Sequence, residues 1–164
     1  MKILDIQHLD VDGTILWQDS NVYNVMHLDG EEHLLRCAFT GGQNSTVVPE
    51  YYYLGLDNRT TVDISDTMAD LIGEPLSGSG YQRSAISSTS SFAINFENGH
   101  YIATSPIVAF VATTGAWGPV TQLFLTDMSD DTGSLISTAT LKSAVSLTAG
   151  QSVTMRIGLA LKEC

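Results

Sequence analysis

Short apolar runs separated by turn residues fill the chain after residue 50. Their β-branched and aromatic residues favour strands, and Gly, Asn, Asp or Pro stand between them at spacings of roughly 8–16 residues. The runs span residues 51–56, 81–86, 92–96, 101–104, 107–112, 120–126, 135–141 and 153–161. Many short strands at such spacings are typical of two packed antiparallel sheets. The pattern therefore predicts an all-β fold, an antiparallel β-sandwich or jelly roll.

Two of these runs carry more detailed predictions. The apolar residues of 92–96 alternate with smaller or polar ones, which indicates a half-buried strand. The dipeptide Asn98-Gly99 that follows favours a tight hairpin turn, because such turns need positive φ. The nearly continuous apolar run 107–112 indicates a buried central strand.

The N-terminal segment also predicts a hairpin, within residues 1–20. Apolar residues cluster at 3–6 and again at 15–17. Between them lies the pair Asp12-Gly13, which suits a tight turn between two strands.

A short amphipathic helix is predicted over residues 29–42. Asp29 can act as N-cap, Glu32 stands three positions later as a capping box requires, and Gly41-Gly42 can end the helix. The apolar stripe of this helix consists of Leu34, Leu35, Ala38 and Phe39.

We therefore expect two parts, an N-terminal hairpin-plus-helix docking arm over 1–48 and a β-sandwich domain over 49–164. Residues 1–48 carry seven acids against Lys2 and Arg36, and their apolar set is too small for a core of its own. The arm should pack on the sandwich or on neighbouring subunits.

Composition narrows the function classes. The chain has 164 residues, 18 acids and 7 Lys and Arg, and its formal net charge is −11, which excludes the clustered cations that nucleic-acid binding needs. Its apolar runs are too short for a membrane span, and its N-terminus lacks the pattern of a secretory signal. Charged residues make up only 15 %, whereas Ser and Thr number 17 each, which is typical of an all-β surface protein.

We find no motif for catalysis, for a cofactor or for a metal site. The four histidines lack metal-ligand spacing, and no HExxH or Gly-x-Ser-x-Gly motif is present. Cys37 lies inside the predicted helix, where a small core residue is a better interpretation than a nucleophile. Two cysteines, Cys37 and Cys164, are too few for a disulfide scaffold.

The acidic loop 127–133 leaves two interpretations open. Asp127, Asp130 and Asp131 could hold a calcium ion with further oxygens from elsewhere, or they could build a long turn between two strands.

Aromatic residues offer a binding surface or a core. Tyr51 and Tyr53 lie on one face of a predicted strand and could be exposed, and Trp117 could stack on a sugar. At a strand start, however, Trp117 is better explained as a buried plug. Arg83 is expected to form a surface ion pair with an acid such as Glu74.

Several short pieces occur in an order that is similar to a known group of proteins. They are Tyr52-Tyr53-Leu54-Gly55-Leu56, Gly73-Glu74-Pro75, Gly80-Tyr81-Gln82-Arg83, Thr104-Ser105-Pro106, Ala116-Trp117-Gly118-Pro119-Val120, Leu123-Phe124-Leu125-Thr126-Asp127, Gly133-Ser134-Leu135-Ile136 and Ala149-Gly150-Gln151-Ser152-Val153. The order resembles tailed-bacteriophage virion structural proteins of the head-decoration or tail-fibre kind, over about residues 50–164. Many of those proteins have Phe-Asp where this chain has Thr126-Asp127, and Pro119 replaces a strand-forming residue. The resemblance implies a structural role and carries over no catalytic residue.

The resemblance implies a non-enzymatic virion component, made in the host cytoplasm. Our first expectation is a capsid decoration (cement) protein, because the chain has no shaft repeat or coiled-coil heptads. The alternatives are a tail, fibre or baseplate protein and, from another class, a carbohydrate-binding module. Expected partners are further copies, most simply as a trimer, and other virion proteins such as the major capsid protein. The interface candidates are Leu34, Leu35, Phe39, Tyr51 and Tyr53.

Overall fold

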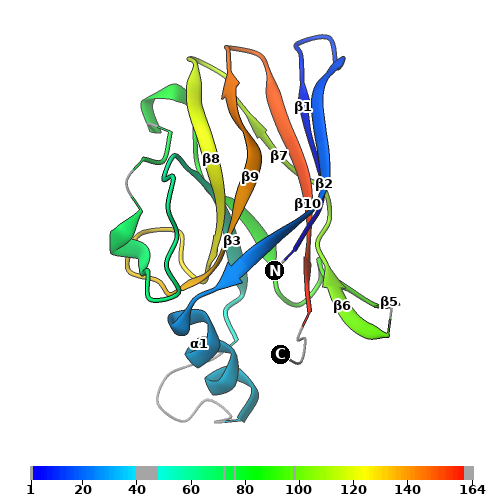
Figure 1. Cartoon of the computed structure of the whole chain (residues 1–164), viewed down its shortest axis with the longest axis vertical. Coiled ribbons are helices and arrows are strands. Elements are labelled where there is room, and N and C mark those ends of the chain that lie inside the picture. The colour runs from blue at the N-terminus through cyan, green and yellow to red at the C-terminus, as the bar shows by residue number, and fades with distance from the viewer. Residues whose placement is uncertain (1, 40–47, 72, 76, 98, 161–164) are drawn as a thin grey trace.

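The computed structural model describes residues 2–39, 48–71, 73–75, 77–97 and 99–160 (Figure 1). The strands are β1 (Lys2–Leu9), β2 (Ile15–Met26), β3 (Tyr51–Asp57), β4 (Ser84–Ser87), β5 (Ala93–Glu97), β6 (His100–Thr104), β7 (Val108–Val111), β8 (Trp117–Thr126), β9 (Leu135–Leu147) and β10 (Ser152–Leu159). The helices are α1 (Leu28–Phe39) and two short 3₁₀ turns, η1 (Met68–Asp70) and η2 (Ser77–Ser79).

The strands form two antiparallel sheets that pack face to face. One sheet has the order β4-β3-β8-β9 and ends with the last part of β2. The other begins with the first part of β2 and continues through β1 to β10. β7 pairs with the first half of β10, and β6 pairs with the second half. β5 pairs with the other side of β6. The predicted antiparallel β-sandwich is confirmed, together with the N-terminal hairpin and one short helix.

Strand β2 belongs to both sheets. Its residues up to Tyr23 pair with β1, and Asn24 to Met26 pair with β9 instead. The change of partner follows Asn21, whose φ of 56° lies in the left-handed region. Asn tolerates this conformation better than most residues with a side chain, so it can bend the strand from one sheet to the other.

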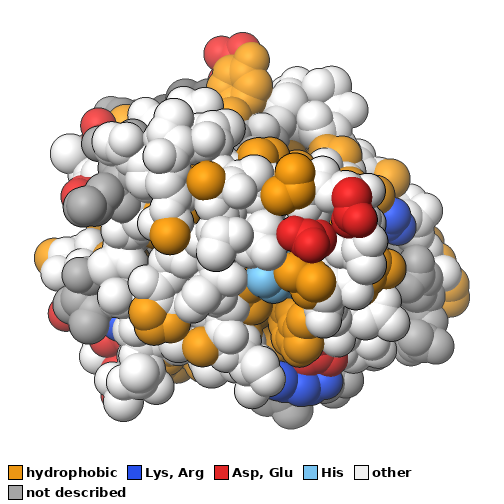
Figure 2. Space-filling view, turned by 90° about the horizontal axis from the view of Figure 1, so that it is seen from above, with side chains coloured by type: hydrophobic (Ala, Val, Ile, Leu, Met, Phe, Trp, Pro, Cys, Tyr) orange, Lys and Arg blue, Asp and Glu red, His pale blue; other side chains and the backbone are white. Residues whose placement is uncertain are grey.

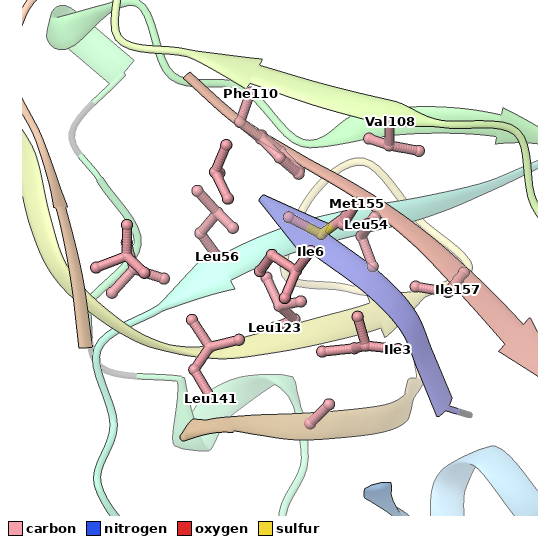
Figure 3. Packing of buried hydrophobic residues seen from close by; sticks show 14 of the residues in the cluster. Ile3, Ile6, Leu54, Leu56, Val108, Phe110, Leu123, Leu141, Met155 and Ile157 are labelled. Atoms are coloured by element: carbon pink, nitrogen blue, oxygen red, sulfur yellow. The ribbon is translucent and has the colours of Figure 1, made fainter. Parts of the chain in front are cut away.

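The core lies between the two sheets (Figure 3). Both sheets contribute aliphatic side chains that are almost fully buried, because alternate residues of each strand point inward. Figure 3 labels Ile3, Ile6, Leu54, Leu56, Val108, Phe110, Leu123, Leu141, Met155 and Ile157 among them. A smaller cluster of Met68, Phe124 and Leu135 lies apart from this core. At Gly55 a side chain would collide with the ring of Phe124, so the ring depends on that glycine.

The N-terminal hairpin is part of the sandwich. Its turn forms as predicted, with Gly13 at φ +85° and a hydrogen bond from the Gly13 N–H to the Asp10 carbonyl. β1 lies between β2 and β10, and Ile3 and Ile6 are fully buried. Within this chain the hairpin pairs with β10 on one side and with β9 on the other. That residues 1–48 also dock on other chains stays a prediction.

Helix α1 is present, but it differs from the prediction in two details. It begins at Leu28, so Asp29 lies in its first turn and the Glu31 N–H donates to the His27 carbonyl. Its buried positions are Gly30 and His33, whereas Leu35 is 57 % exposed. A side chain at Gly30 would collide with the backbone of Ile136, so the glycine allows the helix to lie close against β9. The side chain of Phe39 and the predicted stop at 41–42 lie outside the described residues.

For two strands, the predicted burial is wrong. β5 forms a hairpin with β6, with Gly99 at φ +85°, but Ile94 and Phe96 are 66 % and 65 % exposed. β7 is not central, because among the described strands it pairs with β10 alone, and its residues alternate between buried and exposed. In both cases burial depends on which strands lie alongside, and the local pattern does not contain that information.

Candidate assembly surfaces

An apolar cavity of about 410 Å³ opens beside helix α1. Its wall comes from both sheets and from the helix, and none of the described residues that line it is charged. The lining residues are Met26, Leu34, Cys37, Ala38, Val48, Tyr52, Ala103, Leu125, Ile136, Leu159 and Ala160. A volume in the roughly 300–1,000 Å³ range is typical of sites that take a small ligand or a few side chains.

A hydrogen-bonded group of four side chains lies next to this cavity. His33 Nδ1 donates to the Asp127 carboxylate at 3.1 Å. The Tyr52 hydroxyl and the Cys37 thiol both lie near Nε2, at 3.4 and 3.6 Å. The Tyr52 ring also packs edge-on against His33. The group fixes α1 to strands β3 and β8.

Although Cys37, His33 and Asp127 have the order of a nucleophilic triad, the thiol is not activated. Burial, and then the Asp127 carboxylate, raises the pKa of Cys37, which disfavours the thiolate that a nucleophile requires. Burial also raises the pKa of Tyr52 to about 12. For Asp127, burial acts to raise the pKa, but hydrogen bonds from His33 and the Ser134 N–H outweigh it and lower the pKa. The Tyr52 hydroxyl and the Cys37 thiol therefore stay protonated beside the His33 ring, and Asp127 is the half-buried carboxylate of the cluster.

The predicted interface residues do not form one surface. Leu34 lines the apolar cavity, but Leu35 is exposed. Tyr51 is 39 % exposed, whereas Tyr53 is half-buried beside Arg83 in a separate, more polar hollow of about 510 Å³. Their role in contacts between chains stays a prediction.

The acidic loop has the hydrogen bonds of a long turn. Asp127 accepts from the Ser134 N–H at 2.7 Å, and Asp130 accepts from the Thr132 N–H at 2.9 Å. Asp131 pairs instead with Arg83. The three carboxylates thus have separate partners, and among the described residues no group of three or more His, Cys, Asp or Glu side chains has the arrangement of a metal site.

The predicted pair of Arg83 and Glu74 is present, but it is not a surface pair. The Arg83 side chain is only 6 % exposed, and its Nε and Nη2 reach the two Glu74 oxygens at 3.1 and 2.5 Å. The Tyr81 hydroxyl donates to Glu74 at 2.7 Å and accepts from the Leu56 N–H at 2.8 Å. This network holds the 74–83 segment against β3.

Trp117 is buried at the start of β8, as predicted. Its Nε1 donates to the Ser79 carbonyl at 3.1 Å, and its ring packs edge-on against Tyr81 at 5.4 Å between centroids. The indole therefore belongs to the core and is not available to stack on a sugar. Pro119 is tolerated because the pairing of β8 with β9 is irregular between Trp117 and Val120.

Sequence reasoning missed a buried ion pair. The Arg59 guanidinium lies 3.0 Å from both Asp57 and Asp66, and Asp57 is fully buried. Asp57 also accepts from the Gly73 N–H at 2.9 Å, which ties the 58–73 loop to the end of β3. The segment 57–59 has the composition of an ordinary turn, so no local signal distinguished Arg59 from an exposed side chain.

Surface charges are sparse. Seen from the end that carries the β1–β2 turn, the molecule shows mostly uncharged atoms, with few acidic or basic side chains among them (Figure 2). No helix among the described residues is long and apolar enough to cross a membrane.

The fold and these surfaces define a β-sandwich protein with an apolar cavity beside its helix. Residues 29–160 match the family model of the podophage GP4 fiber I protein gp80, and the chain belongs to this family. No curated protein and no solved structure is significantly similar to the chain. The chain is thus a phage virion structural protein of a fibre family, and it is not an enzyme. The match favours the fibre alternative over capsid decoration, our first expectation.

Proposed function

We propose that this chain is a subunit of a fibre attached to the tail region of a podophage particle. The family match carries this proposal, because it extends from the first turn of α1 beyond the end of β10 and so includes most of the sandwich. The sparse surface charge supports it, since uncharged surfaces cost less to desolvate against another protein. The partners are further copies of the chain and the virion proteins at the fibre's point of attachment.

We further propose that the subunit works as a homo-oligomer, most simply a trimer. Closed symmetry is the usual arrangement of identical subunits. The charge opposes association, because three copies of −11 give −33. Salt screens this repulsion, so the association should strengthen as salt is raised. Light scattering across a salt series measures this, and a monomer at every salt and protein concentration would contradict it.

Labelling purified particles tests the location. Gold-labelled antibodies against the full-length chain should mark the tail region in electron micrographs, and a stained gel should show far fewer copies than the major capsid protein. Labels spread evenly over the head, with a copy number comparable to the capsid protein, would overturn the fibre assignment and restore capsid decoration. Antibodies against the major capsid protein serve as the positive control for head labelling.

A further inference from the structure

The β5–β6 hairpin presents an apolar face to solvent. Phe96 pairs with Tyr101 and Ile94 with Ala103, so these four side chains share one face. Ile94 and Phe96 are two-thirds exposed, Tyr101 is 70 % exposed, and the rings of Phe96 and Tyr101 lie 5.1 Å apart. Exposed aromatic pairs of this kind mark interaction sites.

The hairpin projects because little of it is held by the body. Among the described residues, β6 pairs with β10 through Thr104 with Gly158 and Ala103 with Leu159. The rest of the hairpin extends beyond the sheet, at the same end of the molecule as α1 (Figure 1). On its outer side β5 ends the sheet, so its backbone edge is free of a described strand.

The apolar cavity continues this exposed face. Ala103 lines the cavity and shares a face with Ile94, and Leu159 and Ala160 extend the same wall. Cys37 lies on the helix side of the cavity. One copy therefore carries a projecting apolar hairpin and, beside its base, an apolar hollow large enough for aromatic side chains.

The net charge of the chain indicates which surface of a second copy could contact this cavity. The chain carries −11, so two copies repel one another overall, and contact between uncharged surfaces avoids adding to this repulsion. None of the described residues of the cavity wall is charged, and neither is any residue of the hairpin face of Ile94, Phe96, Tyr101 and Ala103. These two surfaces can thus meet without placing like charges in contact.

We propose that the β5–β6 hairpin of one copy inserts its Phe96 and Tyr101 side chains into the apolar cavity of a neighbouring copy. The contact is heterologous, since a projection meets a hollow, and such contacts close into rings when the rotation allows. The inference rests on the self-association proposed above. At roughly 150–250 Å² for each buried aromatic residue, one contact lies at the small end of protein interfaces. Free subunits should therefore associate weakly, and ring closure should stabilise them.

Cysteine crosslinking tests the contact directly. In a Cys164→Ser background, Phe96→Cys places a thiol on the hairpin, and the native Cys37 supplies its partner in the cavity. Mild oxidation of the full-length chain at high concentration, and of particles that carry it, should yield disulfide-linked multimers on a non-reducing gel. The largest covalent species then reports the number of copies in the ring.

Two matched controls identify the pair. Adding Cys37→Ser to the Phe96→Cys chain should remove the disulfide between position 96 of one copy and position 37 of the next. Val11→Cys is the second control, because Val11 is also exposed but lies in the β1–β2 turn, and its thiol should not link to Cys37. A disulfide between the Phe96→Cys thiol and Cys37 within one chain, or no link in either sample, would overturn the proposal. Either result leaves the fibre assignment intact, because that assignment depends on labelling of the particle.

Three further variants test the contact without oxidation. Phe96→Asp should abolish salt-promoted association, whereas Ile107→Asp, at an equally exposed apolar residue outside the hairpin, should leave it unchanged. Ala38→Trp, which fills the cavity from α1, should also abolish association. Equal effects of Phe96→Asp and Ile107→Asp would mean that general charge, and not the hairpin, governs association. Circular dichroism confirms that each variant is folded.

Discussion

The two hairpins of this chain have similar local sequences and opposite places in the structure. Each joins two apolar runs through a turn that contains glycine, and both glycines have a φ of +85°. The first hairpin, β1–β2, lies inside the sandwich, where β10 and β9 pair with its outer sides. The second, β5–β6, pairs with β10 at two positions among the described residues and exposes its apolar face.

The difference comes from strand β10, which offers pairing positions to three strands. β1 takes the whole of one side, and β7 takes positions Ser152 to Met155 on the other. Among the described residues, β6 pairs on that side with Gly158 and Leu159, near the end of the strand. A hairpin is thus specified locally, but its burial is decided by which edge of a distant strand is still free.

Truncation should give the largest contrast between the hairpins. A chain that begins at His27 loses both strands of the first hairpin and the fully buried Ile3 and Ile6, so we expect no cooperative unfolding transition. Replacing residues 94–102 with a short glycine linker should leave the transition in place. Thermal unfolding followed by circular dichroism measures both, and a folded chain without its first 26 residues would refute the contrast.

Trp117→Ala should show how much stability is lost when a cavity is made in the sandwich core, to which the first hairpin also contributes. Deleting this buried indole should lower the free energy of unfolding by about 3–5 kcal/mol, measured by denaturant titration. In a Trp17→Phe background, iodide should quench the Trp117 fluorescence poorly. Strong quenching would mean that the ring is exposed and would revive the sugar-stacking interpretation.

The same substitution in each hairpin sharpens the comparison. Ile6→Ala, at a fully buried position of β1, should lower the free energy of unfolding by about 2–5 kcal/mol. Ile94→Ala, on the exposed face of β5, should change it by less than about 0.5 kcal/mol. Similar losses at the two positions would show that the second hairpin is buried in the free protein.

The loss of stability as pH falls should depend on His27, which comes directly after strand β2. Burial lowers its pKa below the ordinary value of 6.5, although the charge of Asp66 acts the other way. As pH falls below 6.5, the unfolded chain therefore binds a proton that the folded chain resists. The free energy of unfolding should then decrease by at most about 1.4 kcal/mol per pH unit. His27→Gln should flatten the profile between pH 6.5 and the carboxylate range, and Ile94→Ala should leave it unchanged.

Sequence patterns predicted the secondary-structure elements better than the burial and packing of those elements. The Asp12-Gly13 turn, the β-sandwich and the buried Trp117 all follow from local chemistry, and the structure confirms them. The apolar stripe of α1 was less informative, because Gly30 brings the helix against β9 and turns His33 inward.

The missed parts of the site depend on residues that are distant in sequence. The cluster around His33 requires Asp127, which is 94 positions later, and the cavity combines residues from β2, α1, β3, β6 and β10. Local periodicity carries no information about such pairs. The ion pair of Arg59 with Asp57 is close in sequence, but its burial is decided by the packing of the loop around it.

Strand β2 gives the sandwich a mechanical continuity that two separate sheets would lack. Because the strand passes from β1 to β9 near Asn21, the two layers share one covalent backbone. A force that slides one layer over the other therefore acts on this backbone and on the hydrogen bonds that β2 makes with β1 and with β9. In a subunit that transmits tension along a fibre, this strand would distribute the load over both layers.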